Sequence, residues 1–116
     1  MNNYTLTLID SQDTNEALKV DLLELKKAAL VLRAINHKLR QQILKLIAET
    51  QKITVTDIYV KLRLEQSVAS QHLSILRKAG FVITTREGKY IFYSVNTERI
   101  KEINEFADSI LKSKFL

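Results

Sequence analysis

The sequence has no cysteine and no proline, and only two of its 116 residues are glycine. The absence of cysteine excludes disulfide bonds and thiolate metal sites. No apolar run approaches the length of a membrane-spanning helix, and the N-terminus lacks the basic and apolar regions of a secretory signal. We therefore expect a cytoplasmic protein that is not exported and does not contact a membrane.

Charge and composition narrow the class of function. Lysine and arginine number 18 against 13 aspartate and glutamate residues, a net charge of +5, which favours an anionic partner. With 46% hydrophobic residues, the chain can bury one modest core. A glycine-rich phosphate loop, a nucleophile paired with a base and a cluster of metal ligands are all missing from the sequence, so we do not expect an enzyme.

The first third of the chain predicts an arm followed by a long helix. Residues 1–13 alternate weakly and fit either a short strand or a mobile N-terminal arm. We expect one domain over residues 14–116. Its first helix, at about residues 15–34, is indicated by an apolar stripe with spacings of four, three, four and three: Leu18, Leu22, Leu25, Ala29 and Leu32.

The remaining pattern predicts three more helices, a hairpin and a last helix. The second helix covers "HKLRQQILKLIAET", and a short third helix covers "TVTDIYVKL" with Thr54 as its cap. A fourth helix stops at Gly80. Two β-rich runs, "VITTRE" and "KYIFYSV", then flank Gly88, and a last helix begins at Asn96 or Thr97 and ends near residue 113. The fold is thus mostly α with a small β-hairpin, in the order α-α-α-α-β-β-α.

The fourth helix, "EQSVASQHLSILRKAGFV", has an unusual exposed face. Ser67, Ser70, Gln71, Ser74 and Lys78 lie on one side, although serine is a mediocre helix former. A slim, polar face is what the DNA major groove admits, because base edges are recognised by hydroxyls and amides. The alternative is a water-exposed face that gathered small polar residues by chance. A short helix, a tight connection at "RLE" and this helix together indicate a helix-turn-helix.

With the hairpin and the flanking helices included, the sequence resembles the ArsR family of winged-helix transcriptional repressors over about residues 20–112. "SVASQHLSILRKAGFV" resembles the recognition-helix signature of that family, and "AINHKLRQQILKLI" resembles its second helix. The matching signature positions are Ser70, Gln71, His72, Leu73, Leu76, Ala79, Gly80, Phe81 and Val82. The sequence departs from the family at the start of the second helix, where Asn36, His37, Lys38 and Leu39 replace an Asp-Pro-Thr-Arg-like segment.

The resemblance implies a winged helix-turn-helix homodimer that binds an inverted-repeat operator in double-stranded DNA. It further implies repression that is relieved by an inducer, which the sequence does not identify. The alternative is a winged helix that binds another protein and not DNA. The expected DNA contacts lie on the fourth helix and on the tip of the hairpin, which forms the wing: Gln66, Ser67, Ser70, Gln71, His72, Ser74, Arg77, Lys78, Arg86 and Lys89.

Some of these residues have a second interpretation. His72 fits packing at the edge of the core, a phosphate contact, or both. Arg77 and Lys78 lie where basic residues complement the helix dipole. On the second helix we expect a solvated face that contacts phosphate through at most one of its basic residues, Lys38, Arg40 and Lys45.

The first and last helices predict the dimer interface, because their apolar stripes are longer than a small head can cover. The expected interface residues are Leu18, Leu22, Leu25, Ile100, Ile103, Ala107 and Ile110.

Metal sensors of the ArsR family carry a pair of cysteines on the short helix, and here Thr54 and Thr56 stand in their places. The second metal site of the family aligns with Thr97, Arg99, Ile110 and Ser113, which are not zinc ligands. We therefore expect no metal site and no cofactor.

Overall fold

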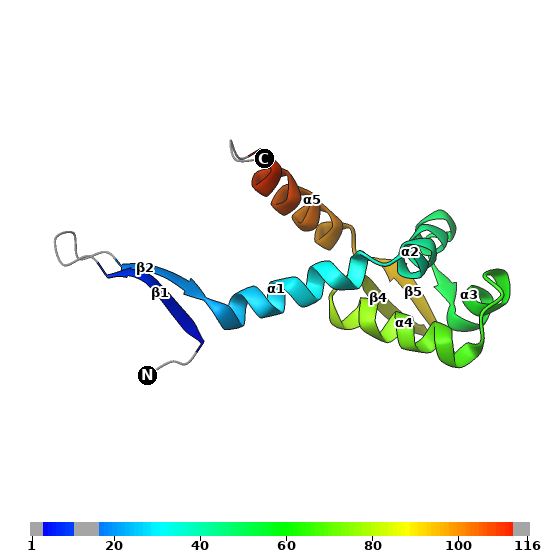
Figure 1. The fold of residues 1–116 in the computed structure, drawn as a ribbon. Helices are drawn as coiled ribbons and strands as arrows, with labels where there is room; N and C mark the ends of the chain where they lie inside the picture. Colours follow the sequence, from blue (N-terminus) through cyan, green and yellow to red (C-terminus); the bar gives the residue numbers. More distant parts are fainter. Residues whose placement is uncertain (1–3, 11–16, 113–116) are drawn as a thin grey trace. The chain divides into compact units, whose positions relative to one another are not determined.

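The computed structural model describes residues 4–10 and 17–112. The chain divides into two compact units, residues 1–33 and residues 34–116, which are described separately (Figure 1). The expected domain boundary between residues 13 and 14 lies outside the described residues. Among the helices of the described part, none is long and apolar enough to cross a bilayer.

The second unit begins with three helices, each expected from the sequence: α2 (Lys38–Thr50), α3 (Val55–Lys61) and α4 (Gln66–Lys78). Helix α3 starts as predicted, because the hydroxyl oxygen of Thr54 accepts a hydrogen bond from the backbone N–H of Asp57. The start of α2 follows the same rule, since the ring nitrogen Nδ1 of His37 accepts from the N–H of Leu39 at 3.2 Å.

Helix α4 ends at a glycine, also as predicted. Gly80 adopts the left-handed conformation with φ of 84°, which glycine tolerates without steric cost. Its N–H donates to the carbonyl of Arg77 at 3.0 Å, and the N–H of Phe81 donates to the carbonyl of Leu76 at 2.9 Å. This pair of bonds is the Schellman motif, which satisfies the last carbonyls of the helix.

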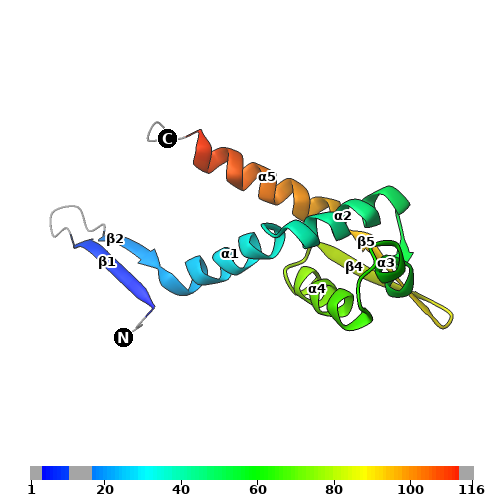
Figure 2. The same ribbon diagram turned by 45° about the vertical axis from the view of Figure 1, so that its right-hand side comes forward.

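A hairpin follows α4 and forms the predicted wing. Strands β4 (Val82–Glu87) and β5 (Tyr90–Val95) pair in antiparallel register through a two-residue turn, in which Gly88 has φ of 63°. Figure 2 shows the tip of this hairpin extending past α3. The sheet has a third strand that the sequence pattern does not predict, β3 (Ile53–Thr54), which pairs with β5 and gives the order β3-β5-β4.

Helix α5 (Thr97–Leu111) is the last element, and of the two expected caps Asn96 is the one used. The helix ends at Leu111 with Lys112 as its C-cap, two residues before the expected end near residue 113. The core of the second unit is formed by fully buried side chains from α2, α3, α4 and the start of the hairpin. They are Ile43, Ile47, Ile58, Leu73, Leu76, Phe81 and Val82.

In the first unit, the first helix begins later than the sequence predicts. Residues 17–21 are not helical, because they form strand β2 (Ala17–Asp21), which pairs with β1 (Thr5–Asp10). Helix α1 (Leu22–Ile35) begins only after Asp21, whose carboxylate accepts hydrogen bonds from the N–H groups of its first turn. Leu18 therefore lies on a strand. Residues 1–13 were expected to form either a short strand or a mobile arm, and residues 5–10 form a strand.

Candidate nucleic-acid interface

Helix α4 is amphipathic in the way the sequence predicts. Ala69, Leu73 and Leu76 are fully buried on one side. No residue from Gln66 to Leu76 is acidic, lysine or arginine, and the two basic residues of the helix lie in its last turn. The exposed residues are Gln66, Ser67, Ser70, Gln71, Ser74, Arg77 and Lys78.

The connection from α3 to α4 is short and tight. Leu62 ends α3, and the N–H of Leu64 donates to the carbonyl of Tyr59 at 2.9 Å. Between them Arg63 has φ of 55°, a left-handed conformation that reverses the chain within a few residues. The result is a short helix, a turn and a second helix with a slim polar face, the arrangement that places the second helix in a major groove about 12 Å wide.

His72 is half-buried at the edge of this face. Its ring nitrogen Nδ1 lies 3.1 Å from an Nη1 nitrogen of Arg40. Because a guanidinium only donates hydrogen bonds, Nδ1 must accept, and the ring proton of the neutral imidazole is therefore on Nε2. Partial burial lowers the pKa of His72 below its usual value, and the nearby His37 and Arg40 lower it further. The ring of His37 lies 5.0 Å away, centroid to centroid. His72 thus packs at the core edge.

Arg40 was expected on a solvated face, and this prediction is wrong. The residue is only 9% exposed. Its Nε donates to the carbonyl of Ala34 at 2.5 Å, and its Nη1 contacts His72. A buried guanidinium is tolerated when its donors find partners. Arg40 therefore ties α2 to α4, and it is not a candidate for a phosphate contact.

Arg86 and Lys89 lie at the tip of the wing, and both are exposed. The Nε of Arg86 donates to the carbonyl of Gly88 at 3.2 Å, which holds the arginine along the turn. The ammonium of Lys89 lies 5.4 Å from the ring centre of Tyr90. Positive charge therefore gathers at the end of the hairpin.

Lys52 is a wing contact that the sequence analysis missed. It precedes β3, and its ammonium lies 2.7 Å from the carboxylate of Glu87 and 4.9 Å from the ring centre of Phe92. Both partners of this ion pair are half-exposed, so the pair adds little stability. Its electrostatic effect is to offset the one acidic residue of the hairpin. Only the pairing of β3 with β5 brings Lys52 there, so no local sequence signal reveals it.

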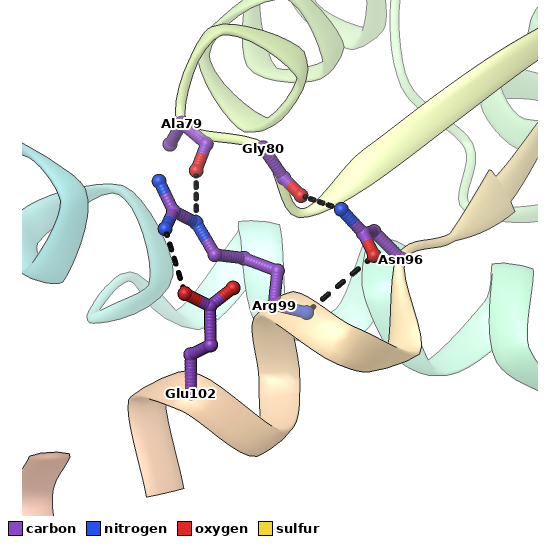
Figure 3. Close-up of polar contacts among 5 residues, drawn as sticks. All are labelled: Ala79, Gly80, Asn96, Arg99 and Glu102. Carbon is purple, nitrogen blue, oxygen red and sulfur yellow. Dashed lines mark hydrogen bonds and ion pairs between the residues drawn. The ribbon is translucent and has the colours of Figure 1, made fainter. Parts of the chain in front are cut away.

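The C-terminal end of α4 is bonded to the start of α5 (Figure 3). The Nε of Arg99 donates to the carbonyl of Ala79 at 2.9 Å, and the side-chain amide of Asn96 donates to the carbonyl of Gly80 at 2.9 Å. Arg99 also lies 3.8 Å from the carboxylate of Glu102. We call the Arg99 and Asn96 bonds to these two carbonyls the α4–α5 joint.

The α4–α5 joint includes Arg99, which stands at one of the positions aligned with the second metal site of the ArsR family. Arg99 is a cation that complements the negative end of the α4 dipole. Thr54, at one of the aligned cysteine positions, is occupied as the cap of α3. Across residues 4–10 and 17–112, no three His, Asp or Glu side chains lie together in a way that could hold a metal ion.

The predicted dimer-interface residues divide between the two units. Leu18, Leu22 and Leu25 of the first unit are 54%, 37% and 57% exposed. On α5, no residue is buried. Ile100 and Ile103 are half-buried, whereas Ala107 and Ile110 are exposed. Each stripe therefore has apolar surface that its own unit does not cover.

A family model described as the arsR family of bacterial regulatory proteins matches residues 37–84, which run from the cap of α2 into β4. An HTH-type transcriptional regulator of Methanocaldococcus jannaschii is 39% identical, and the alignment covers 73% of this chain and 96% of that protein. The transcriptional activator HlyU of Vibrio cholerae is 34% identical over 68% of this chain and 72% of its own length.

Solved structures give the same result. The transcriptional repressor PagR of Bacillus anthracis superposes with a TM-score of 0.59 at 29% identity, covering 73% of this chain and 97% of that chain. The transcriptional regulator HlyU of Vibrio vulnificus superposes with a TM-score of 0.57 at 33% identity, covering 76% and 91%.

Proposed function

The chain belongs to the arsR family of bacterial regulatory proteins, and we propose that it represses transcription as a homodimer on an inverted-repeat operator. As a member of this family it is a DNA-binding transcriptional regulator and not an enzyme.

The observation that carries the proposal is the slim polar face of α4. Ser70 and Gln71 are exposed at its centre. Hydroxyls and amides hydrogen-bond base edges, and glutamine pairs well with adenine. We therefore assign base contacts to the centre of α4, and backbone contacts to its basic last turn and to Arg86 and Lys89 on the wing.

A homodimer accounts for the exposed apolar stripes. A two-fold dimer that buries α1 and α5 would remove Leu25 and Ile110 from water. It would also present two α4 helices to successive major grooves, about 34–36 Å apart on one face of the duplex. The operator is then an inverted repeat, because its symmetry matches that of the protein.

Repression is the simpler direction of regulation for such a dimer. PagR is named a repressor and HlyU an activator, so the family occurs with both. A dimer that occupies a promoter blocks polymerase sterically, and this effect needs no further partner. A reporter under the bound promoter is therefore expected to fall when the protein is produced.

The test begins by selecting the fragments of the source genome that the protein binds. Replacing Ser70 or Gln71 with alanine should reduce discrimination between operator and mismatched DNA by about 1–3 kcal/mol for each base edge that the side chain contacts directly. Gln42→Ala is the matched control, because Gln42 is an exposed glutamine on α2. Fluorescence anisotropy gives the dissociation constants.

Two outcomes would contradict the proposal. If both α4 variants kept the preference of the unmodified protein, the base contacts lie elsewhere. If the protein bound no duplex at low salt and instead captured a partner protein, its winged helix would serve protein contacts.

A further inference from the structure

The hairpin of the first unit has one wholly apolar face. Leu6 pairs with Val20 and Ile9 pairs with Leu18 across β1 and β2. The register shifts between Thr7 and Ile9, where one extra residue makes a β-bulge. Because cross-strand partners share a face, the bulge brings Leu6 and Ile9 to the same side although they are three residues apart.

The opposite face of the hairpin is polar. Thr5 pairs with Asp21, and Thr7 pairs with Lys19. The paired residues of the hairpin therefore form one face suited to water and one suited to a protein surface, and Leu8, the extra residue of the bulge, is 58% exposed.

Within the described part of the first unit, nothing covers the apolar face. Leu6, Ile9 and Leu18 are 43%, 57% and 54% exposed. Among the residues from Tyr4 to Arg33 whose exposure is described, none is buried. A two-stranded hairpin is at best marginally stable in water, and it needs a third strand or a packed surface. The hairpin is therefore expected to gain stability from a further surface that covers this face.

The hairpin is also bonded to the helix that we assign to the dimer. The N–H of Leu22, the first residue of α1, donates to the carbonyl of Tyr4 at 2.5 Å. Strand β2 runs into α1 without an intervening loop. A surface that packs on the first turns of α1, where Leu22 and Leu25 are exposed, therefore meets the hairpin as well.

We propose that the face formed by Leu6, Ile9, Leu18 and Val20 packs against a second copy of this chain and extends the dimer interface beyond the helices. A second copy is favoured because the hairpin continues directly into α1, the helix assigned to the proposed dimer. The face carries no charge, so two copies related by a two-fold axis can meet there without opposing like charges. This inference rests on the proposed homodimer.

The first experiment uses the absence of cysteine from the chain. In Ile9→Cys the only thiol lies on the apolar face, and in Thr7→Cys it lies on the polar face. The expected result for the purified protein is slow labelling of Ile9→Cys by a thiol reagent in the dimer and faster labelling as dilution releases monomers. Thr7→Cys should label at the same rate throughout.

Each other labelling pattern overturns the inference. Protection of Ile9→Cys that does not change on dilution would mean that the chain covers its own hairpin. Equal and fast labelling of both variants in the dimer would mean that the face is open, or is kept for a different protein.

A second experiment measures the strength of the dimer. Replacing Ile9 and Leu18 together with lysine should raise the dimer dissociation constant about 100-fold or more, because buried apolar side chains are exchanged for charges. Thr7→Lys, which adds a charge on the polar face, should leave the constant nearly unchanged. Sedimentation velocity over a dilution series gives both values.

The two proposals can fail separately. An unmodified protein that sediments as a monomer would contradict the proposed homodimer. An unmodified dimer that persists unchanged in the double lysine variant would contradict only the role of the hairpin.

Discussion

His72 shows how a single residue of α4 can make the stability of the protein depend on pH. Its Nδ1 accepts from Arg40 only while the ring is neutral, and its surroundings lower its pKa. An unfolded histidine has a pKa of about 6.5. Below that pH the unfolded chain binds the proton more readily than the folded chain, so the free energy of unfolding should fall as the pH is lowered from about 6.5.

The measurement is urea unfolding at a series of pH values and at one protein concentration. In His72→Gln a side-chain carbonyl can accept from Arg40 without titrating, so the fall in stability should be smaller than in the unmodified protein. The carboxylates are common to both proteins, so their contribution cancels in the comparison. Parallel pH profiles for the two proteins would show that His72 does not contribute.

At the scale of elements, the α4–α5 joint connects the helix proposed to contact DNA with a helix proposed for the dimer. Arg99→Met keeps the apolar stem and removes the hydrogen bond to Ala79. Because the carbonyl is deprived of a charged donor, we expect the free energy of unfolding to fall by about 1–2 kcal/mol. Operator affinity should fall as well, because the end of α4 is less firmly held. Urea unfolding and anisotropy measure the two effects.

Glu102→Gln is the control for the joint. It removes the exposed ion pair with Arg99 but leaves the bond to Ala79, so its effect on stability should be small. A destabilisation in Glu102→Gln as large as that in Arg99→Met would show that the ion pair, and not the carbonyl bond, holds the two helices.

At the scale of the whole molecule, the net charge of +5 per chain should make DNA binding depend steeply on salt. Neutralised phosphates release counterions, so the logarithm of the association constant falls linearly with the logarithm of salt concentration. Replacing Arg86 and Lys89 with alanine should reduce the magnitude of this slope by about 0.9 for each phosphate that is no longer neutralised. Anisotropy titrations at several salt concentrations give the slope.

Lys26→Ala combined with Lys27→Ala removes the same charge from α1, and its dimerisation is checked first by sedimentation. Its slope should match that of the unmodified protein. If both double variants changed the slope equally, net charge alone would set the salt dependence, and the wing would have no specific contact.

Local chemistry made much of the second unit predictable from the sequence. A cap acts within one turn of its own helix, so Thr54 and Asn96 marked the starts of α3 and α5. A positive φ is a property of one residue, so Gly80 marked the end of α4. The polar face of α4 follows from the helical period alone. These signals need no knowledge of what lies across the core.

The sequence by itself thus determined the order of helices in the second unit, the wing and the polar face of α4. Only the tertiary structure decided that Leu18 lies on a strand, that Arg40 is buried and that Arg99 bonds the end of α4. The helical spacing from Leu18 to Leu22 is real, yet pairing with β1 determines the conformation of residues 17–21. The partners of these three residues come from other elements, and a local pattern holds no information about contacts that form only when distant segments meet.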